Sequence, residues 1–447
     1  MTAQLDQKDL LDRAARLVAA AKRAGADASD AVCVRGMSLS VEVRLGKVEE
    51  TRRAEGDDFN LRAFVGRRSA TVSANVLTDP AELAERAVAM ARVAPEDAYA
   101  GLADPARLAR DFPQLDLLDE MMPTAERLTA QALAVEDAAR AVPGVTNSGG
   151  GSASWRLGGI VLATSGGFAG DYLSSRFSIS ASAIAGTGTG MERDYEFDSR
   201  IHHSDLADPE DIGRKAGERA VRRLGPRQMA TGRGTVVYDA RLSNGLLGSL
   251  AGAVNGAAIA RKTSFLLSSL GKQVLATAIN VVDDPHRLRG LASRPFDGEG
   301  VASLPIDLVK DGVLTTWLLD SATARELGFV TNGRAARGGG NPSPGATNLT
   351  MLAGARSPEA IIAGIDNGLY VTELIGHGAN IMTGDYSRGA AGFVIENGKL
   401  GHAVSEVTIA GNLAEMFLHM EAANDLTYRF SVNAPTLAVE GMTIAGR

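Results

Sequence analysis

Cysteine is almost absent from this sequence of 447 residues, in which Cys33 is the single example. One cysteine cannot form an intramolecular disulfide, so the fold must be stabilised by packing and hydrogen bonds. Val32 and Val34 flank this residue and predict that its thiol is buried in a strand. The pattern therefore argues against a reactive, exposed thiol.

Long apolar stretches are also missing. No run of about 18 apolar residues occurs, which argues against an ordinary transmembrane helix. The N-terminal segment, residues 1–15, contains acidic residues and lacks the apolar core of a signal peptide. We therefore expect a cytoplasmic protein that does not bind a membrane.

An excess of positive charge is absent as well. The chain has 46 Lys and Arg residues against 53 Asp and Glu residues, which gives a formal net charge of −7. Nucleic-acid binding takes much of its affinity from clustered Lys and Arg. Basic clusters here are short pairs, such as Arg52-Arg53 and Arg222-Arg223. We therefore expect no nucleic-acid partner.

Glycine is abundant by comparison, with 51 residues, whereas aromatic residues make up 5% of the chain. A chain of 447 residues exceeds the usual size of one core, so we expect two domains. In residues 1–225, helical apolar spacing over 9–22 and alternation over 39–45 predict helices that cover an antiparallel sheet. This N-terminal domain divides into a helix and sheet part, 1–95, and a second part, 123–225.

The second domain, residues 226–447, is predicted to be sheet-rich, as a barrel-like fold or a sandwich around one central helix. Asn397-Gly398 between apolar runs indicates a tight hairpin, and residues 274–282 have the composition of a buried strand. Residues 334–348 show no periodicity, which predicts a long loop that is poorly ordered without a partner. The predicted fold class is therefore α+β.

The central helix is predicted within Leu246 to Gly271 and carries an unusual stripe. Leu246, Leu247 and Leu250 follow helical spacing, while Gly248, Gly252 and Gly256 recur every four residues. Each glycine inside a helix costs about 0.5–1 kcal/mol relative to alanine, so a stripe of them suggests a close neighbour. That neighbour is either another packed element or a substrate segment in a cleft.

Two other stretches have residues that could carry chemistry. Ser269-Leu270-Gly271-Lys272 matches the S-x-x-K pattern of penicillin-binding enzymes, although the accompanying motif is out of order. His377 lies between glycines, as suits a loop lining a cleft, and Asp385 follows it.

Two acidic clusters could serve proton transfer or a hard cation, but their proline and glycine residues favour structural turns. They are Asp283-Asp284-Pro285 and Asp297-Gly298-Glu299.

A series of uncommon segments surrounds and follows the central helix. Taken in order, they resemble the TldD/PmbA family, in its PmbA/TldE branch. The resemblance spans the C-terminal half closely and the N-terminal half more loosely. Its segments are Lys262-Thr263-Ser264-Phe265-Leu266, Asp283-Asp284-Pro285, Phe296-Asp297-Gly298-Glu299-Gly300, Gly384-Asp385-Tyr386-Ser387-Arg388-Gly389-Ala390, Thr408-Ile409-Ala410-Gly411-Asn412-Leu413 and Ile444-Ala445-Gly446.

In that family, a TldD-type subunit carries a helical H-E-x-x-x-H motif that binds a metal and cleaves peptides. The PmbA-type subunit is its partner in a heterodimer. The resemblance places Leu247 and Gly252 at the histidine positions and Gly248 at the glutamate position. Leucine and glycine supply neither zinc ligands nor a general base. The resemblance therefore implies no cofactor on this chain, with the metal, expected to be zinc, on the partner subunit.

The resemblance implies a non-catalytic subunit that binds unfolded peptides, holds them along a sheet edge, and guides them for proteolysis or maturation by a TldD-type partner. Two alternatives stay open. One is an independent hydrolase that uses Ser269 or the His377–Asp385 segment, and the other is a homodimeric peptide-binding protein without an enzymatic partner. The candidate cleft residues are Gly248, Gly252, Gly256, Asn255, His377 and Asp385.

Overall fold

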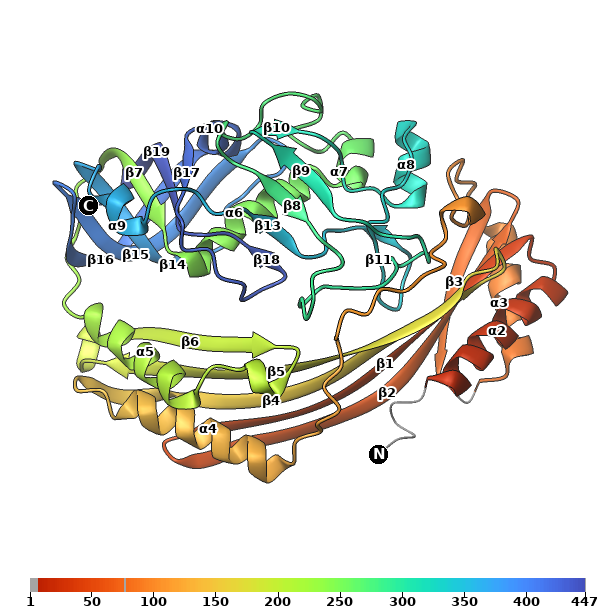
Figure 1. The fold of residues 1–447 in the computed structure, drawn as a ribbon, viewed down its shortest axis with the longest axis horizontal. Coiled ribbons are helices and arrows are strands. Elements are labelled where there is room, and N and C mark those ends of the chain that lie inside the picture. The colour runs from red at the N-terminus through yellow and green to blue at the C-terminus, as the bar shows by residue number, and fades with distance from the viewer. Residues whose placement is uncertain (1–6, 76–77, 447) are drawn as a thin grey trace.

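The computed structural model describes residues 7–75 and 78–446, which form two halves that face one another (Figure 1). The expectation about a signal peptide rests partly on residues 1–6, which lie outside this range. In the N-terminal half, an antiparallel sheet has the strand order β3-β2-β1-β4-β5-β6. Its elements are α2 (Lys8–Arg23), β1 (Ala28–Arg44), β2 (Lys47–Val65), β3 (Arg68–Asn75), α3 (Pro80–Val93), η1 (Pro105–Arg107), α4 (Ala125–Arg140), β4 (Val145–Thr164), β5 (Ala169–Ala185), η2 (Gly188–Gly190), β6 (Glu192–Arg200), η3 (His203–Asp205) and α5 (Pro209–Arg222).

Amphipathic helices cover the outer face of this curved sheet. Helices α2 and α3 pack on one end of it, and α4 and α5 pack on the other (Figure 1). Asp79, Thr124 and Asp208 begin α3, α4 and α5, because their side chains accept hydrogen bonds from backbone N–H groups of the first turn. The predicted helix over 9–22 is confirmed as α2. Cys33 is buried in β1 as predicted, and burial raises the pKa of its thiol to about 12.

The two faces of the sheet have different partners, because side chains alternate along each strand. Cys33 of β1 packs against the helices, and so does Ala153 of β4. Val32 of β1 instead packs with Phe296 of the C-terminal half. The side of the sheet that faces the C-terminal half is termed the inner face. It carries the side chains of the even-numbered residues within 34–42, 152–160 and 172–182.

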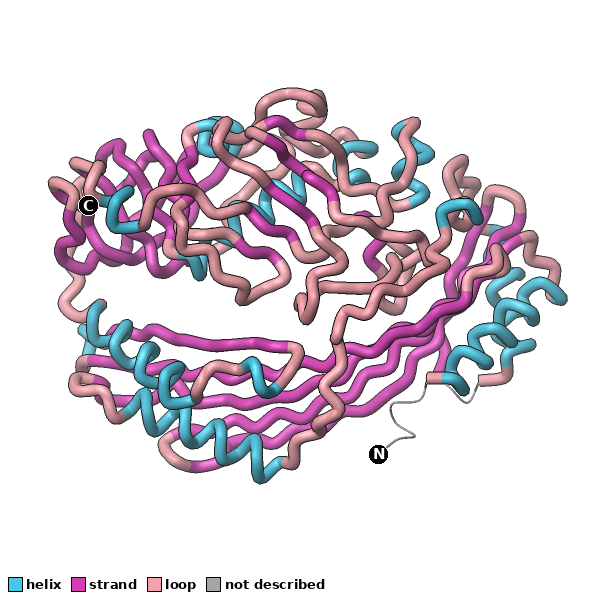
Figure 2. Tube along the Cα trace, viewed as in Figure 1, coloured by secondary structure: helices cyan, strands magenta, loops and turns pink. Residues whose placement is uncertain are grey.

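The C-terminal half lies over the inner face and contains a closed barrel (Figures 1 and 2). Strands pair in the order β16-β15-β14-β7-β19, and β19 pairs again with β16. A second sheet has the order β10-β9-β8-β13-β18. The elements are β7 (Gly232–Tyr238), α6 (Ala240–Ala253), α7 (Gly256–Ala260), β8 (Val281–Asp283), β9 (Ile306–Lys310), β10 (Val313–Leu314), α8 (Ser321–Leu327), β11 (Ala335–Ala336), β12 (Ser343–Pro344), β13 (Leu349–Met351), α9 (Pro358–Ile362), β14 (Asn367–Ile375), β15 (Asp385–Glu396), β16 (Lys399–Asn412), α10 (Leu413–Leu418), β17 (Met420–Ala422), β18 (Val432–Asn433) and β19 (Leu437–Ala445).

These features confirm the α+β class and the barrel-like C-terminal part. Asn397 and Gly398 have φ angles of 49° and 76°, as the two central residues of a type I′ hairpin require, and they join β15 to β16. The boundary at Gly225-Pro226 stays a prediction. Among the described residues, no helix is long and apolar enough to cross a membrane.

One prediction about the C-terminal half was wrong, and a second was only partly right. Of residues 274–282, only the last two join a strand, β8, because the preceding backbone amides bond to scattered carbonyls instead of a ladder. The Val274 N–H, for example, donates to the Gly312 oxygen over 2.8 Å. The predicted loop over 334–348 contains the short ladder of β11 and β12. The first residue of this loop, Arg334, is fully buried and forms an ion pair with Asp283, which holds the loop in place.

The two halves are joined along β6, the edge strand of the N-terminal sheet. Arg241, at the start of α6, donates from Nη1 to the Tyr195 carbonyl oxygen (2.9 Å) and to the Asp194 carboxylate (3.0 Å). Its guanidinium carbon lies 5.4 Å from the centroid of the Tyr195 ring. One side chain thus binds the backbone, the acid and the ring at one point of the edge.

Arg429 repeats this arrangement farther along β6. It donates to the Phe197 carbonyl oxygen (2.9 Å), pairs with Glu196, and lies 5.3 Å from the centroid of the Phe197 ring. The two side chains, Arg241 and Arg429, are termed the arginine clasp. The amides of Tyr195 and Phe197 are also bonded, to the carboxylates of the residues before them. Side chains of this same chain therefore satisfy these edge groups, which are not available to an added strand.

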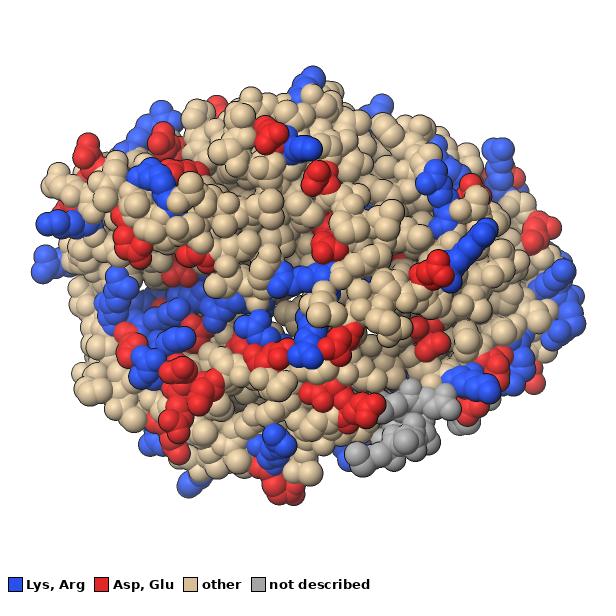
Figure 3. All heavy atoms as spheres, in the orientation of Figure 1, with Lys and Arg blue, Asp and Glu red and all other residues tan. Residues whose placement is uncertain are grey.

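Further ion pairs surround the clasp. Arg223, at the end of α5, pairs with Glu373 of β14, and Arg219 of α5 pairs with Glu196. Acidic and basic side chains intermingle in the groove between the halves, at the left of Figure 3. Because the Asp194 and Glu196 side chains are only 3% and 1% exposed, their charges depend on these partners.

We predict that Arg241→Gln lowers the free energy of unfolding by about 3–5 kcal/mol, because it leaves a buried carboxylate without its main partner. Arg214→Gln serves as the control, since this exposed side chain pairs with Asp211 and Glu218 on its own helix. The control should lose no more than about 1 kcal/mol. Chemical denaturation measures both, and equal losses would contradict a stabilising clasp.

Candidate functional site

Helix α6 separates the buried core from an open groove. Its buried residues include Leu246, Leu247 and Leu250, which belong to the main core of the C-terminal half. Gly245 and Gly248 are exposed on the other side. The helix ends at Ala253, so the predicted continuous stripe is interrupted.

The interruption places the three predicted glycines in different surroundings. A Cβ atom on Gly248 would meet nothing within 4 Å, and on Gly252 it would lie 3.7 Å from Ile381. On Gly256, the first residue of α7, it would lie 2.7 Å from the Leu318 carbonyl oxygen. Close packing therefore explains Gly256, whereas Gly248 borders open space.

Asn255 links the two helices. Its side-chain oxygen caps α7 by accepting from the Ala257 N–H (3.0 Å), and its Nδ2 donates to the Pro344 carbonyl oxygen (2.7 Å). Both ends of the amide are thus engaged within the fold. The residue therefore ties the start of α7 to β12.

A cleft of about 400 Å³ lies between α6 and the loop that joins β14 to β15. It contains His377 but none of the three predicted stripe glycines and not Asp385. Its lining residues are Leu242, Gly245, Leu246, Ser249, Leu374, Gly376, His377, Gly378, Ala379, Tyr386 and Arg388.

The loop over this cleft has a fixed path. A Cβ atom on Gly378 would fall 1.8 Å from the Ser387 carbonyl oxygen, so only glycine fits there. The adjacent His377 is exposed in the cleft. Asp385 lies at the start of β15, where it accepts a hydrogen bond from Thr383 Oγ1 (2.6 Å). That contact braces the loop from outside the cleft.

The floor of the cleft contains a buried phenol. Burial raises the pKa of Tyr386, which is 5% exposed. Burial, and then Tyr386, also raises the pKa of Tyr238, whose hydroxyl donates to Met442 Sδ (3.4 Å). Arg388 has a buried Nε without a hydrogen-bond partner among the described residues. The cleft therefore offers hydrogen-bond donors, from Tyr386 and Arg388, beside apolar surface. This combination suits the binding of a ligand that has both polar and apolar groups.

The structure shows which residues occupy the positions that the resemblance assigns to the hydrolytic motif. The positions that the resemblance assigns to metal ligands hold Leu247, buried in the core, and two glycines, and these residues do not fit a metal. In the described part of the chain, no group of three His, Cys, Asp or Glu side chains is placed to hold a metal ion. Ser269 lies in a turn, and its hydroxyl makes no hydrogen bond to a basic side chain among the residues described.

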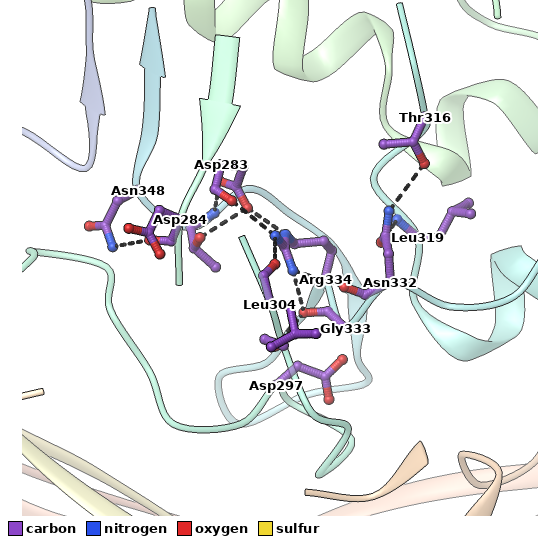
Figure 4. Close-up of polar contacts among 12 residues, drawn as sticks. Asp283, Asp284, Asp297, Leu304, Thr316, Leu319, Asn332, Gly333, Arg334 and Asn348 are labelled. Atoms are coloured by element: carbon purple, nitrogen blue, oxygen red, sulfur yellow. Dashed lines mark hydrogen bonds and ion pairs between the residues drawn. The ribbon is translucent and has the colours of Figure 1, made fainter. Parts of the chain in front are cut away.

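The two acidic clusters are used inside the fold. Buried Arg334 pairs with Asp283 and donates to that residue's carbonyl oxygen over 3.1 Å (Figure 4). Asp297 accepts hydrogen bonds from the N–H groups of Glu299 and Val301, both at 2.9 Å. Burial, and then the Asp297 carboxylate, raises the pKa of Glu299 to about 7. These carboxylates stabilise turns of the C-terminal half.

Sequence reasoning missed several residues of the cleft. Leu242, Gly245 and Ser249 follow helical spacing on one side of α6 and would have been found by extending that pattern toward the start of the helix. Arg388 lies within a segment quoted for the family resemblance, but no local pattern indicates that it faces α6. That placement depends on the pairing of β14 and β15.

Comparison with known proteins gives consistent results along the chain. Profiles of the PmbA/TldA metallopeptidase match residues 29–91 (domain 1), 122–224 (central domain) and 231–446 (C-terminal domain). The Metalloprotease PmbA of Escherichia coli O157:H7 is 36% identical over 99% of this chain and 97% of its own length.

Two crystal structures share the fold. A protein of Bacteroides thetaiotaomicron, proposed as a modulator of DNA gyrase, has a TM-score of 0.90 and 28% identity, with 99% of each chain covered. TldE from Thermococcus kodakarensis has a TM-score of 0.86 and 21% identity, over 97% of this chain and 99% of that one.

Gly248 of α6 and Gly256 of α7 allow a test of which glycine has a close neighbour in the fold. Gly248→Ala should raise the free energy of unfolding by about 0.5–1 kcal/mol, because the added methyl group meets no neighbour and favours the helix. Gly256→Ala should lower it by about 1–3 kcal/mol, because its Cβ would overlap a backbone oxygen. Denaturant unfolding of the two variants checks this, and a loss of stability in Gly248→Ala would show that something packs on that face.

Proposed function

Because the chain belongs to the PmbA/TldD family of metallopeptidases, we propose that it is a non-catalytic, PmbA/TldE-type subunit. In this role it pairs with a TldD-type chain in the cytoplasm. It binds unfolded peptides and guides them for proteolysis or maturation by the complex. The metal, expected to be zinc, and the general base belong to the partner.

The observation that carries this proposal is the chemistry of α6. Leu247 turns a hydrocarbon side chain into the core, and Gly248 and Gly252, which do not line the cleft, offer only backbone. A catalytic zinc site needs about three nitrogen, sulfur or carboxylate ligands beside an open position. The helix therefore retains the place of a hydrolytic motif without the donors that the motif requires.

Peptide binding is supported by the surfaces that remain open. The cleft beside α6 is lined by His377, Arg388 and apolar side chains, a mixture that suits an extended peptide. The inner face of the N-terminal sheet adds a polar surface. The arginine clasp occupies the backbone groups of Tyr195 and Phe197, so the expected pairing of substrate along this edge does not apply there. We therefore place the peptide over the inner face and the cleft.

Peptide cleavage tests the assignment of roles. The purified chain alone should leave unfolded peptides intact, and adding a TldD-type subunit should produce metal-dependent cleavage. A TldD-type subunit whose own metal ligands are replaced should abolish cleavage in the complex. Robust, chelator-sensitive cleavage by this chain alone would contradict the proposal and favour an independent hydrolase.

Assembly is measured in the same samples by sedimentation. A complex of both subunit types is the expected result. A stable homodimer that binds peptides but ignores the TldD-type subunit would favour the binding protein without an enzymatic partner.

A further inference from the structure

Two arginines on the inner face stand directly opposite each other. Arg156 of β4 and Arg176 of β5 are register partners in the antiparallel ladder. Side chains at such positions lie close together on one face of a sheet, where like charges destabilise the pairing. The arrangement places two positive charges side by side on an exposed part of the sheet, where an anion could bind to both.

The protein itself does not supply that anion among the described residues. Neither guanidinium lies within ion-pair distance of a described carboxylate, and the Arg176 Nη2 donates only to the Leu291 carbonyl oxygen (2.8 Å). Other arginines of the same sheet have acidic partners, as Arg35 has in Asp57 and Arg62 has in Asp30. With 53 acidic residues against 46 basic ones, the chain has no general shortage of carboxylates.

The surroundings of this arginine pair suit an anionic ligand. Ser38 is the register partner of Arg156 on β1, and a row of serines lies beside the pair on the same face. Ser154 faces Ser178, whose hydroxyl lies 2.7 Å from that of Ser199. Hydroxyl groups donate hydrogen bonds to anions and add no opposing charge.

The space above the pair is open on one side. Gly36 and Gly158 are register partners next to Ser38 and Arg156, and a Cβ atom on either glycine would meet nothing within 4 Å. On the other side, the Leu291 carbonyl brings the C-terminal half against Arg176. Both arginine side chains are exposed to solvent, and partial burial, and then Arg156, lowers the pKa of Arg176.

We propose that Arg156 and Arg176 form a carboxylate-binding site on the inner face, so that the peptides handled by this protein are bound preferentially through an acidic group. This inference rests on the proposed peptide-binding function and specifies its substrate class. A planar guanidinium matches a carboxylate through paired N–H donors, and two of them facing one ligand strengthen that match. The acidic group is either a side chain or the C-terminal carboxylate of the peptide.

Calorimetric titration of the full chain tests the site with unlabelled peptides. The probes are an extended peptide with one glutamate and its glutamine counterpart, each with a free or an amidated C-terminus. The double variant R156Q/R176Q should lose at least about tenfold in affinity for the preferred acidic peptide, as expected for charge-assisted hydrogen bonds. Its affinity for the neutral, amidated peptide should match that of the unmodified chain.

The matched control is R140Q/R214Q, which makes the same change in net charge on α4 and α5, on the outer side of the sheet. It should bind all peptides as the unmodified chain does. Thermal unfolding should show that R156Q/R176Q is at least as stable as the unmodified chain, because a like-charged pair is removed. A loss confined to peptides with a glutamate identifies a side-chain site, and a loss confined to free C-termini identifies a terminal one.

Three results would overturn the inference. The first is an unchanged preference for acidic peptides in R156Q/R176Q. The second is equally tight binding of inorganic phosphate without any effect on peptides. The third is loss of assembly with a TldD-type subunit while peptide binding is unchanged, which would make the pair an interface. Absence of all cleavage in the unmodified complex would instead refute the proposed function. The titrations would still show whether Arg156 and Arg176 bind an acidic group.

Discussion

The relation between the two halves depends on the arginine clasp at β6. Arg241 and Arg429 reach across from the C-terminal half, and each binds a backbone oxygen, an acid and a ring of the edge strand. Desolvated carboxylates such as Asp194 and Glu196 would be strongly unfavourable without these cations. The clasp therefore covers β6, the edge strand of the N-terminal sheet. A peptide cannot form main-chain hydrogen bonds to the backbone groups that the clasp occupies.

The arginine clasp leaves two surfaces for a peptide, which are the inner face of the N-terminal sheet and the cleft beside α6. The long strands β4 and β5 turn apolar side chains toward their helices and serines and arginines toward the C-terminal half. Helix α6 likewise places Leu247 and Leu250 in the core, while Gly245 and Ser249 line the cleft. Both surfaces offer donors and bare backbone instead of paired acids and bases. Such surfaces are suited to holding an extended chain.

Much of the fold follows from local patterns, and the site follows from them only in part. Helical spacing indicates α2, alternation indicates part of β1, and the Asn397-Gly398 dipeptide indicates the hairpin, because each is specified by neighbours in sequence. The glycine stripe was extended past Ala253 because spacing alone does not show where Asn255 starts a new helix. Pairing of Arg156 with Arg176 depends on strand register, which single-sequence patterns do not give.

We propose that this chain holds peptides on its inner face and beside α6 without hydrolysing them. Photo-crosslinking of an unfolded peptide to the purified chain, followed by mass spectrometry, tests both parts together. We expect a full-length peptide to be crosslinked to residues 150–160, to residues 172–182, or to residues that line the α6 cleft. A shortened peptide, or adducts confined to the outer helices α2 to α5, would contradict it.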